Sequence, residues 1–306
     1  MGKDLCTHIP QIKKELSLIT ELLGYDLSKY MFEGPKSALF PKPDSPIPTI
    51  FLEVSIALSL AIANSLRTAN ITPDAVAGRS MGEYSAYAFA KAFDITTCFL
   101  LVRAISIYAQ MDCLKNPGSL VTIYGLNLKE IQEVIKEVIK KTNDKCEIAI
   151  FYEKPRIAVL GMKNAVITPL KKQVSKYEHR LTISKEGGPF HTTILNDCVE
   201  KNLNFFNSVS FNKIQYPIYT NCSGKKQKNS SKLKTDLLNG INHRVKWQET
   251  IEEMLSDGMR VFVEMAPGAM LTEFICDIPP DAIILRTDTP ENYKKTLKFL
   301  KENSIS

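Results

Sequence analysis

A short apolar run leads without a break into a glycine-flanked serine, and this junction constrains the fold more than any other feature. Residues 75–78 (Ala-Val-Ala-Gly) are typical of a short buried strand, and residues 82–92 have the spacing of an amphipathic helix. Between them, Gly78-Arg79-Ser80-Met81-Gly82 matches the G-x-S-x-G pattern of a strand-to-helix turn that exposes a serine. Glycines on both sides remove Cβ atoms that would clash in a sharp turn. The junction therefore predicts an α/β body with a parallel sheet and Ser80 raised above it.

A serine hydroxyl in such a turn becomes a nucleophile only if a base lies beside it. The chain offers four histidines, which are His8, His179, His191 and His243. His191 lies in the glycine-rich segment 187–192, where the chain leaves one predicted unit and enters another, so its side chain can face a cleft. We therefore predict the pair Ser80 and His191. An inert serine in a tight turn and a structural histidine remain the alternatives.

The middle of the chain has its own rhythm of strands and helices. The order is β-α-β-β-α-β, the pattern of a ferredoxin-like unit. The predicted strands are 119–124, 147–152, 156–160 and 180–184, and the predicted helices are 128–141 and 167–177. We expect an α/β-hydrolase-like catalytic body from residues 1–117 and 190–306, with a ferredoxin-like subdomain, 118–189, inserted in it.

The composition is that of a folded globular chain. Of 306 residues, 44% are hydrophobic and 24% charged, which excludes disordered, collagen-like and coiled-coil proteins. The net charge of +6 is too small and too dispersed to predict binding to nucleic acid. Seven widely spaced cysteines without a C-x-x-C motif predict reduced thiols, no metal site and a cytoplasmic location. The N-terminal segment lacks the apolar core of a secretory signal.

Three further segments carry expectations of their own. Residues 49–66 are apolar, but they contain Glu53 and Asn64 and barely reach the length of a membrane span, so they predict a buried core helix and no membrane. Residues 34–48 hold five prolines and predict a loop. Residues 224–234 (GKKQKNSSKLK) predict a polar, mobile, lysine-rich loop.

The segment AGRSMGEYSAYAFAKAF resembles the serine segment of malonyl-CoA:acyl carrier protein transacylases and the related acyltransferases of polyketide synthases. Further stretches that resemble this family are GSLVTIYGL, GPFHT, PIYTNCSG, RVKWQETIEEM and FVEMAPGAMLTEF. The resemblance implies that Ser80 carries the acyl group, that His191 is the base and that the Met81 N–H is an oxyanion donor. It also implies that a backbone carbonyl orients the histidine, at the position matching Lys246.

The same resemblance implies the substrates and partners. They are acyl-CoA and phosphopantetheine thioesters and an acyl carrier protein, with no metal or redox cofactor. The lysines of 224–234 would then be either a solvated surface or a basic rim that steers the acidic carrier protein. The family pattern starts with a strand carrying Gly-Gln-Gly, whose glutamine is an oxyanion donor, and this chain starts after it. The resemblance therefore predicts an upstream strand or a missing donor, and the latter would fit a non-catalytic paralogue that binds carrier protein.

Two departures from the family pattern concern the acyl group. Ile105 stands where the family has the arginine that binds the malonyl carboxylate, and Arg103 would face the opposite side of its helix. Arg79 replaces the histidine before the serine and is a second guanidinium that can bind a carboxylate. Ile105 favours a neutral acyl group or a thioester hydrolase, whereas Arg79 favours malonyl, so both readings stay open.

Overall fold

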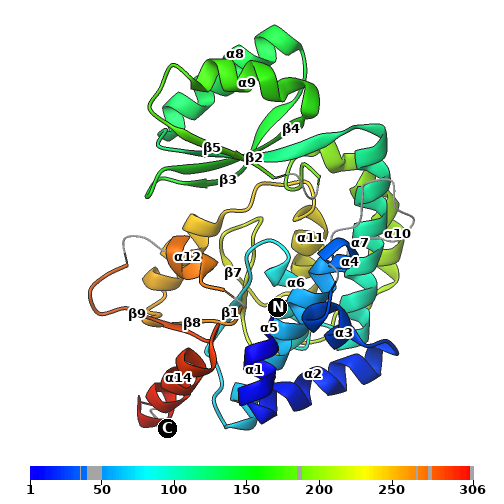
Figure 1. Cartoon of the computed structure of the whole chain (residues 1–306), viewed down its shortest axis with the longest axis vertical. Helices are drawn as coiled ribbons and strands as arrows, with labels where there is room; N and C mark the ends of the chain where they lie inside the picture. Colours follow the sequence, from blue (N-terminus) through cyan, green and yellow to red (C-terminus); the bar gives the residue numbers. More distant parts are fainter. Residues whose placement is uncertain (35, 40–49, 185–187, 267, 275–277, 304–306) are drawn as a thin grey trace.

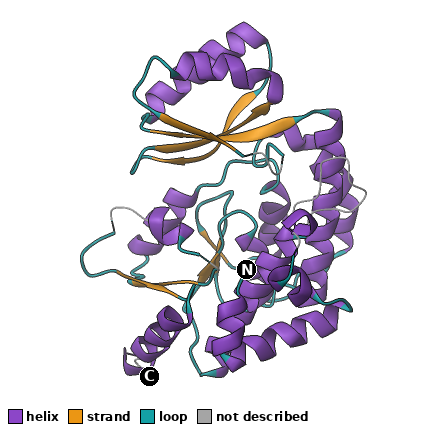
Figure 2. Ribbon diagram, in the orientation of Figure 1, coloured by secondary structure: helices purple, strands orange, loops and turns teal. Residues whose placement is uncertain are grey.

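The computed structural model describes residues 1–34, 36–39, 50–184, 188–266, 268–274 and 278–303. A larger body of helices and short strands carries a smaller subdomain at one end (Figure 1). The subdomain is an antiparallel sheet covered on its outer face by two helices (Figure 2). This arrangement confirms the predicted α/β class with a parallel body sheet and a small antiparallel subdomain.

The described elements of the subdomain run from Gly118 to Ile183, inside the predicted segment 118–189. Its strands are β2 (Gly118–Tyr124), β3 (Cys146–Tyr152), β4 (Ile157–Lys163) and β5 (Arg180–Ile183). Its helices are α8 (Leu128–Thr142), η1 (Asn164–Val166) and α9 (Ile167–Val174). The strand order is β3-β4-β2-β5, with every neighbouring pair antiparallel. Apolar residues of α8 and α9, such as Val134 and Leu170, fill the space above the sheet.

The other face of this sheet packs on the body through an apolar cluster that includes Ile150 and Trp247. The edge strand β3 also bonds to the body, because the N–H of Val245 donates to the Ala149 carbonyl at 2.9 Å. The subdomain is therefore held by both side-chain packing and a backbone hydrogen bond along one edge.

The described residues of the body form two small sheets with parallel pairs. In the first, β1 (Val76–Ala77) lies parallel to β6 (Ile218–Tyr219), and β7 (Lys226–Gln227) is antiparallel to β6. In the second, β8 (Val261–Glu264) is parallel to β9 (Ile283–Arg286). The parallel β1–β6 pair matters most, because the chain leaves β1 into the serine turn.

Helices form most of the body. The N-terminal helices are α1 (Lys3–His8), α2 (Pro10–Leu23), α3 (Leu27–Phe32), α4 (Lys36–Leu39), α5 (Phe51–Thr68), α6 (Gly82–Phe89) and α7 (Ile95–Lys115). The later ones are η2 (Thr193–Leu195), α10 (Asn196–Ser208), α11 (Ser230–Asn239), α12 (Trp247–Ser256), α13 (Met270–Phe274) and α14 (Pro290–Asn303). The apolar α5 packs against α2, α6 and α7 at the centre of the body (Figure 1).

Among the residues that the structure describes, two helices, α5 and α7, are long and apolar enough to be candidate membrane spans. In α5, 67% of the 18-residue apolar stretch is buried inside the protein, as predicted for a core helix. Its Glu53 forms an ion pair with Arg103 at 2.9 Å. In α7, 44% of the corresponding 18-residue apolar stretch is buried. For α5, apolar composition therefore reflects a core position.

Two loop predictions and the cysteines have different outcomes. The prediction that residues 224–234 form a loop is wrong. β7 begins at Lys226, and α11 begins at Ser230 with the Asn229 side chain as its N-cap. Within 34–48, residues 36–39 form α4, and residues 35 and 40–48 lie outside the described residues. Six cysteines are free thiols, and Cys276 also lies outside the described residues.

Candidate active site

Ser80 lies in the turn between β1 and α6, with a positive φ of 54°. The turn is possible because residue 78 is glycine, since a Cβ there would lie 2.0 Å from the carbonyl oxygen of Gly82. Gly82 is different, because a Cβ at that position would meet no atom within 4 Å. Only the first glycine of the motif is therefore needed for space.

The structure brings together the predicted pair. The Oγ of Ser80 lies 2.6 Å from Nε2 of His191, although 111 residues separate them in sequence. His191 follows the described segment 188–190 where the chain re-enters the body, and its φ is also positive, at 64°. Its side chain is buried, with 8% of the residue exposed. Two residues in unfavourable backbone conformations thus meet at one point, as is common at functional sites.

The carbonyl that orients the histidine belongs to Gly240, just after α11. It lies 2.6 Å from Nδ1 of His191. The prediction of Lys246 is wrong, because the Lys246 carbonyl accepts hydrogen bonds from the N–H and hydroxyl of Thr250 at the start of α12. A carbonyl only accepts, so Nδ1 carries the proton and Nε2 is the acceptor for the serine hydroxyl.

The imidazole of His191 is neutral in the resting protein. Burial, with a smaller effect of the Arg79 cation, lowers the pKa of His191 to about 4, although the hydrogen bond to Gly240 opposes the shift. At neutral pH the ring therefore has the free Nε2 lone pair that a general base requires.

Sequence reasoning missed Asn221, which follows β6. Its Oδ1 accepts the Ser80 N–H at 2.8 Å and its Nδ2 donates to the Gly78 carbonyl at 2.6 Å. Its segment, PIYTNCSG, was among those that resemble the family, but a single asparagine after a strand gives no further signal. The side chain therefore holds the serine turn from below the nucleophile.

Arg79 points from the turn toward the subdomain and the C-terminal part of the body. One nitrogen of its guanidinium donates to the Tyr152 hydroxyl on β3 at 2.9 Å, and another lies 2.9 Å from the sulfur of Met270 on α13. Arg79 directly precedes Ser80, and its cation is one of the causes that lower the pKa of His191. Arg79 therefore lies beside the reacting groups, where three parts of the fold meet.

The two other predicted selectivity residues lie on α7. Ile105 is buried in the main apolar core of the body. Arg103 bonds to both carboxylate oxygens of Glu53 and to the Tyr25 hydroxyl. Because these contacts occupy its guanidinium on another face of α7, Arg103 is a structural residue of the body.

Met81 follows the serine at the start of α6. In the part of the chain that the structure describes, its backbone N–H has no hydrogen-bond acceptor. A backbone donor next to the nucleophile is the usual oxyanion donor of a strand-to-helix serine turn. The geometry is therefore compatible with the predicted role.

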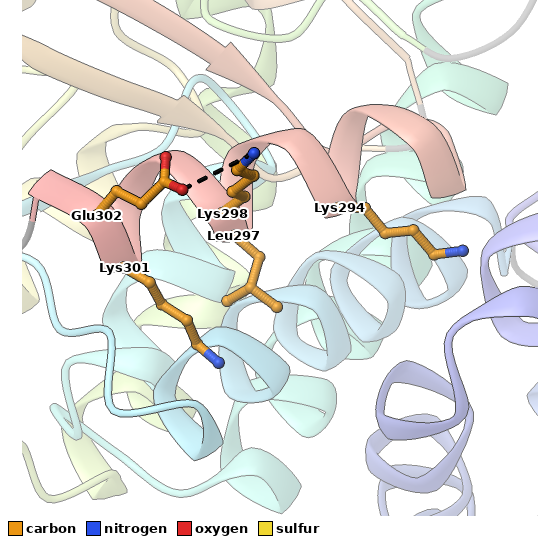
Figure 3. Close-up of a pocket in the computed structure, with 5 residues that line it drawn as sticks. All are labelled: Lys294, Leu297, Lys298, Lys301 and Glu302. Atoms are coloured by element: carbon orange, nitrogen blue, oxygen red, sulfur yellow. Dashed lines mark ion pairs between the residues drawn. The ribbon is translucent and has the colours of Figure 1, made fainter.

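Other features of the described residues add nothing to this site. Over those residues, no group of three or more His, Cys, Asp or Glu side chains could hold a metal. A surface hollow lies along α14, lined by Lys294, Leu297, Lys298, Lys301 and Glu302 (Figure 3). Lys298 and Glu302 pair across it at 3.8 Å. The hollow belongs to one helix face and includes no residue of the serine turn or the histidine segment.

Comparison with known proteins agrees with this geometry. The family model described as "Acyl transferase domain" matches residues 47–278. The malonyl CoA-acyl carrier protein transacylase of Bacillus subtilis (strain 168) is 23% identical over 307 residues, which cover 99% of this chain and 94% of that protein. The polyketide biosynthesis malonyl CoA-acyl carrier protein transacylase PksC of the same organism is 28% identical over 267 residues, covering 86% and 87%.

Solved structures show the same fold. A complex of the malonyl-transacylase PlMCAT with the type II polyketide-synthase acyl carrier protein AntF matches with a TM-score of 0.88 and 21% identity, covering 98% of this chain and 94% of that one. The transacylase of Streptococcus pneumoniae matches with a TM-score of 0.84 and 24% identity, covering 98% and 95%. With the family match spanning most of its length, this chain belongs to the acyl transferase domain family and is an acyltransferase of the malonyl-CoA:acyl carrier protein transacylase family.

Proposed function

We propose that this protein moves an acyl group from a coenzyme A thioester to the phosphopantetheine thiol of an acyl carrier protein, in fatty-acid or polyketide synthesis. The observation that carries the proposal is the 2.6 Å contact between Ser80 Oγ and His191 Nε2 on a strand-to-helix turn. The two Bacillus subtilis relatives, named as malonyl transacylases, support this substrate class.

In the first half-reaction, Ser80 attacks the carbonyl carbon of the thioester. Its proton moves to Nε2 of His191 as the new C–O bond forms. The Met81 N–H stabilises the negative charge on the carbonyl oxygen. The C–S bond then breaks, and the departing sulfur takes the proton from Nε2. The products are acyl-Ser80 and free coenzyme A.

In the second half-reaction, the pantetheine thiol of the carrier protein gives its proton to Nε2 of His191. The sulfur attacks the ester carbonyl, the C–O bond to Ser80 breaks, and Oγ recovers the proton. No metal or redox cofactor enters either half, because each step only moves a proton and an acyl group. The hydrogen bond from Nδ1 to Gly240 keeps the imidazole in one orientation throughout.

The acyl group is the open part of the substrate. Ile105, at the position where the resembling family carries a carboxylate-binding arginine, favours a neutral acyl chain. An unpaired carboxylate in an apolar pocket costs several kcal/mol. Arg79 is the competing feature, because it directly precedes Ser80 in the chain and a guanidinium can pair with a carboxylate. We place the weight on Ile105 and a neutral acyl group.

Carrier-protein binding is supported by the solved complex of AntF with its malonyl-transacylase. Fewer lysines of the segment 224–234 are available to bind a carrier protein than its composition indicates, because two of them bond within the protein. Lys226 pairs with Asp257 at 2.5 Å, and Lys234 donates to the Val209 carbonyl at 2.7 Å. Lys225, Lys228 and Lys232 are the members we assign to a docking rim. A cytoplasmic location fits these substrates.

A second function, hydrolysis of acyl thioesters, is favoured by the same isoleucine. An experiment on the acyl-enzyme distinguishes transfer from hydrolysis. The enzyme is first loaded with acetyl-CoA, and the excess acetyl-CoA is removed. Adding holo-acyl carrier protein should move the acetyl group onto the carrier protein within the time in which acyl-enzyme alone stays intact. Release of acetate at one rate, with or without the carrier protein, would indicate the hydrolase.

A further inference from the structure

A buried asparagine lies directly beneath the nucleophile. The side-chain amide of Asn221 binds the N–H of Ser80 and the carbonyl of Gly78, the residues on either side of Arg79. An amide offers both an acceptor and a donor, so one side chain satisfies both backbone groups. Asn221 is 2% exposed, so both hydrogen bonds lie in the protein interior.

The serine turn needs such support. A non-glycine residue with positive φ is in an unfavourable conformation and persists only where its surroundings fix it. Ser80 is in this state, with a φ of 54°. Because the bond to Asn221 is made by the Ser80 N–H itself, loss of the amide would free the backbone that aims Oγ.

The buried carboxyl group of Glu83 lies between Asn221 and the turn at Gly240 that binds the histidine. Glu83, in the first turn of α6, is 2% exposed, and its Oε1 accepts the Asn221 N–H at 2.9 Å. Its Oε2 faces the other way, 3.4 Å from the point where a Cβ on Gly240 would lie. The Gly240 carbonyl is the acceptor for Nδ1 of His191. Glu83 therefore lies between the group that holds the serine and the turn that holds the histidine.

We infer that Asn221 and Glu83 form a positioning bridge that fixes the distance between Ser80 Oγ and His191 Nε2. The inference rests on the proposed function, since a distance between these atoms matters only if they react. The bridge acts through backbone groups. Its effect should therefore be the same whichever acyl group the enzyme transfers.

The carboxyl of Glu83 serves this role as a neutral group. Burial, with a smaller effect of the nearby Asp236, raises the pKa of Glu83 to about 8, although the hydrogen bonds from Asn221 oppose the shift. A neutral carboxyl group and a carboxamide have nearly the same shape and the same acceptor oxygen. Glutamine should therefore replace Glu83, whereas alanine should not.

The test measures the rate at which a fluorophosphonate probe labels Ser80, because this reagent needs the serine and its base but no acyl pocket. Asn221→Ala and Glu83→Ala should each slow labelling by about 10²-fold, the effect of a misplacement near 1 Å. Glu83→Gln should label like the wild type. Asn202→Ala is the matched control: it removes a buried asparagine on α10 that donates to the Cys198 carbonyl.

Melting temperatures separate positioning from general destabilisation, since Asn202→Ala should lose stability without losing labelling. If Asn221→Ala does not fold, Asn221→Ser carries the test, because a hydroxyl is too short to bridge both backbone groups. The inference would be overturned if Asn221→Ala and Glu83→Ala were labelled as fast as the control Asn202→Ala. It would also be overturned if Glu83→Gln and Glu83→Ala lost the labelling rate equally. A wild type that the probe does not label would instead overturn the proposed function, and this inference with it.

Discussion

The Nδ1 atom of His191 lies 2.6 Å from the carbonyl oxygen of Gly240, so a backbone group orients the imidazole. A carbonyl keeps the same charge at every pH, unlike the aspartate of many serine enzymes. The orientation of His191 therefore does not depend on the ionisation of a neighbouring acid, and the pH dependence of the pair is set by the imidazole itself.

The first prediction concerns that pH dependence. Because burial, followed by the Arg79 cation, lowers the pKa of His191 to about 4, the base stays neutral well below the usual range of histidine. The rate of Ser80 labelling by a fluorophosphonate should fall on the acid side only near pH 4. Arg79→Gln should move this limb upward, but not to the ordinary value of 6.5, since burial remains. A wild-type limb at 6.5 would contradict the buried, neutral imidazole.

The two motif glycines give a matched pair of variants. Gly78→Ala places a Cβ 2.0 Å from the Gly82 carbonyl oxygen, so the turn must open. Gly82→Ala meets open space at the start of α6. We expect Gly78→Ala to lose acyl loading and several degrees of melting temperature, and Gly82→Ala to keep both. Equal behaviour of the two variants would show that the turn differs from the one described.

Acyl selectivity is tested by loading the enzyme with acetyl-CoA and malonyl-CoA. An unpaired carboxylate penalised by about 3 kcal/mol gives roughly 100-fold preference for acetyl. Ile105→Arg should raise malonyl loading relative to acetyl. Since Ile105 is buried, this variant needs a melting-temperature check, and Arg79→His carries the test if it does not fold. If the wild type prefers malonyl and Arg79→His loses that preference, the carboxylate site is at Arg79 and the neutral-acyl proposal is wrong.

Glu83 makes a prediction about stability that does not involve the reaction. Its pKa is raised in the folded protein to about 8, from the ordinary value of 4.5. The folded state therefore binds more protons than the unfolded state between these values, so the free energy of unfolding falls as pH rises from 4.5 to 8. Urea unfolding across this range should show the wild type losing stability relative to Glu83→Gln, which does not titrate. A constant difference would contradict the buried position of the carboxyl group.

The sequence predicted the parts of the site that have a local pattern. Ser80 sits between a strand and a helix with a known motif, and His191 was one of four histidines in a distinctive glycine-rich segment. Gly240 could not be predicted in this way, because every residue has a carbonyl and only the fold decides which one reaches His191. Resemblance alone placed this role at Lys246, six positions away on the other side of a turn.

The same reason explains Asn221 and Glu83, whose roles depend on contacts across about 140 positions in the chain. The helix α11 had a usable signal that composition obscured. Asn229 is a typical N-cap residue, and Leu233 and Leu237 are spaced for one helix face. The lysines and serines around them made the segment look like a loop.

The central claim is that Ser80 carries the acyl group, and intact-protein mass spectrometry after incubation with a panel of acyl-CoA thioesters tests it most directly. The wild type should gain the mass of one acyl group from at least one member of the panel. Ser80→Ala should gain none while keeping its melting temperature, because Gly78 and Asn221 still shape the turn. An alanine variant that gains the same acyl mass would show that another residue is the nucleophile.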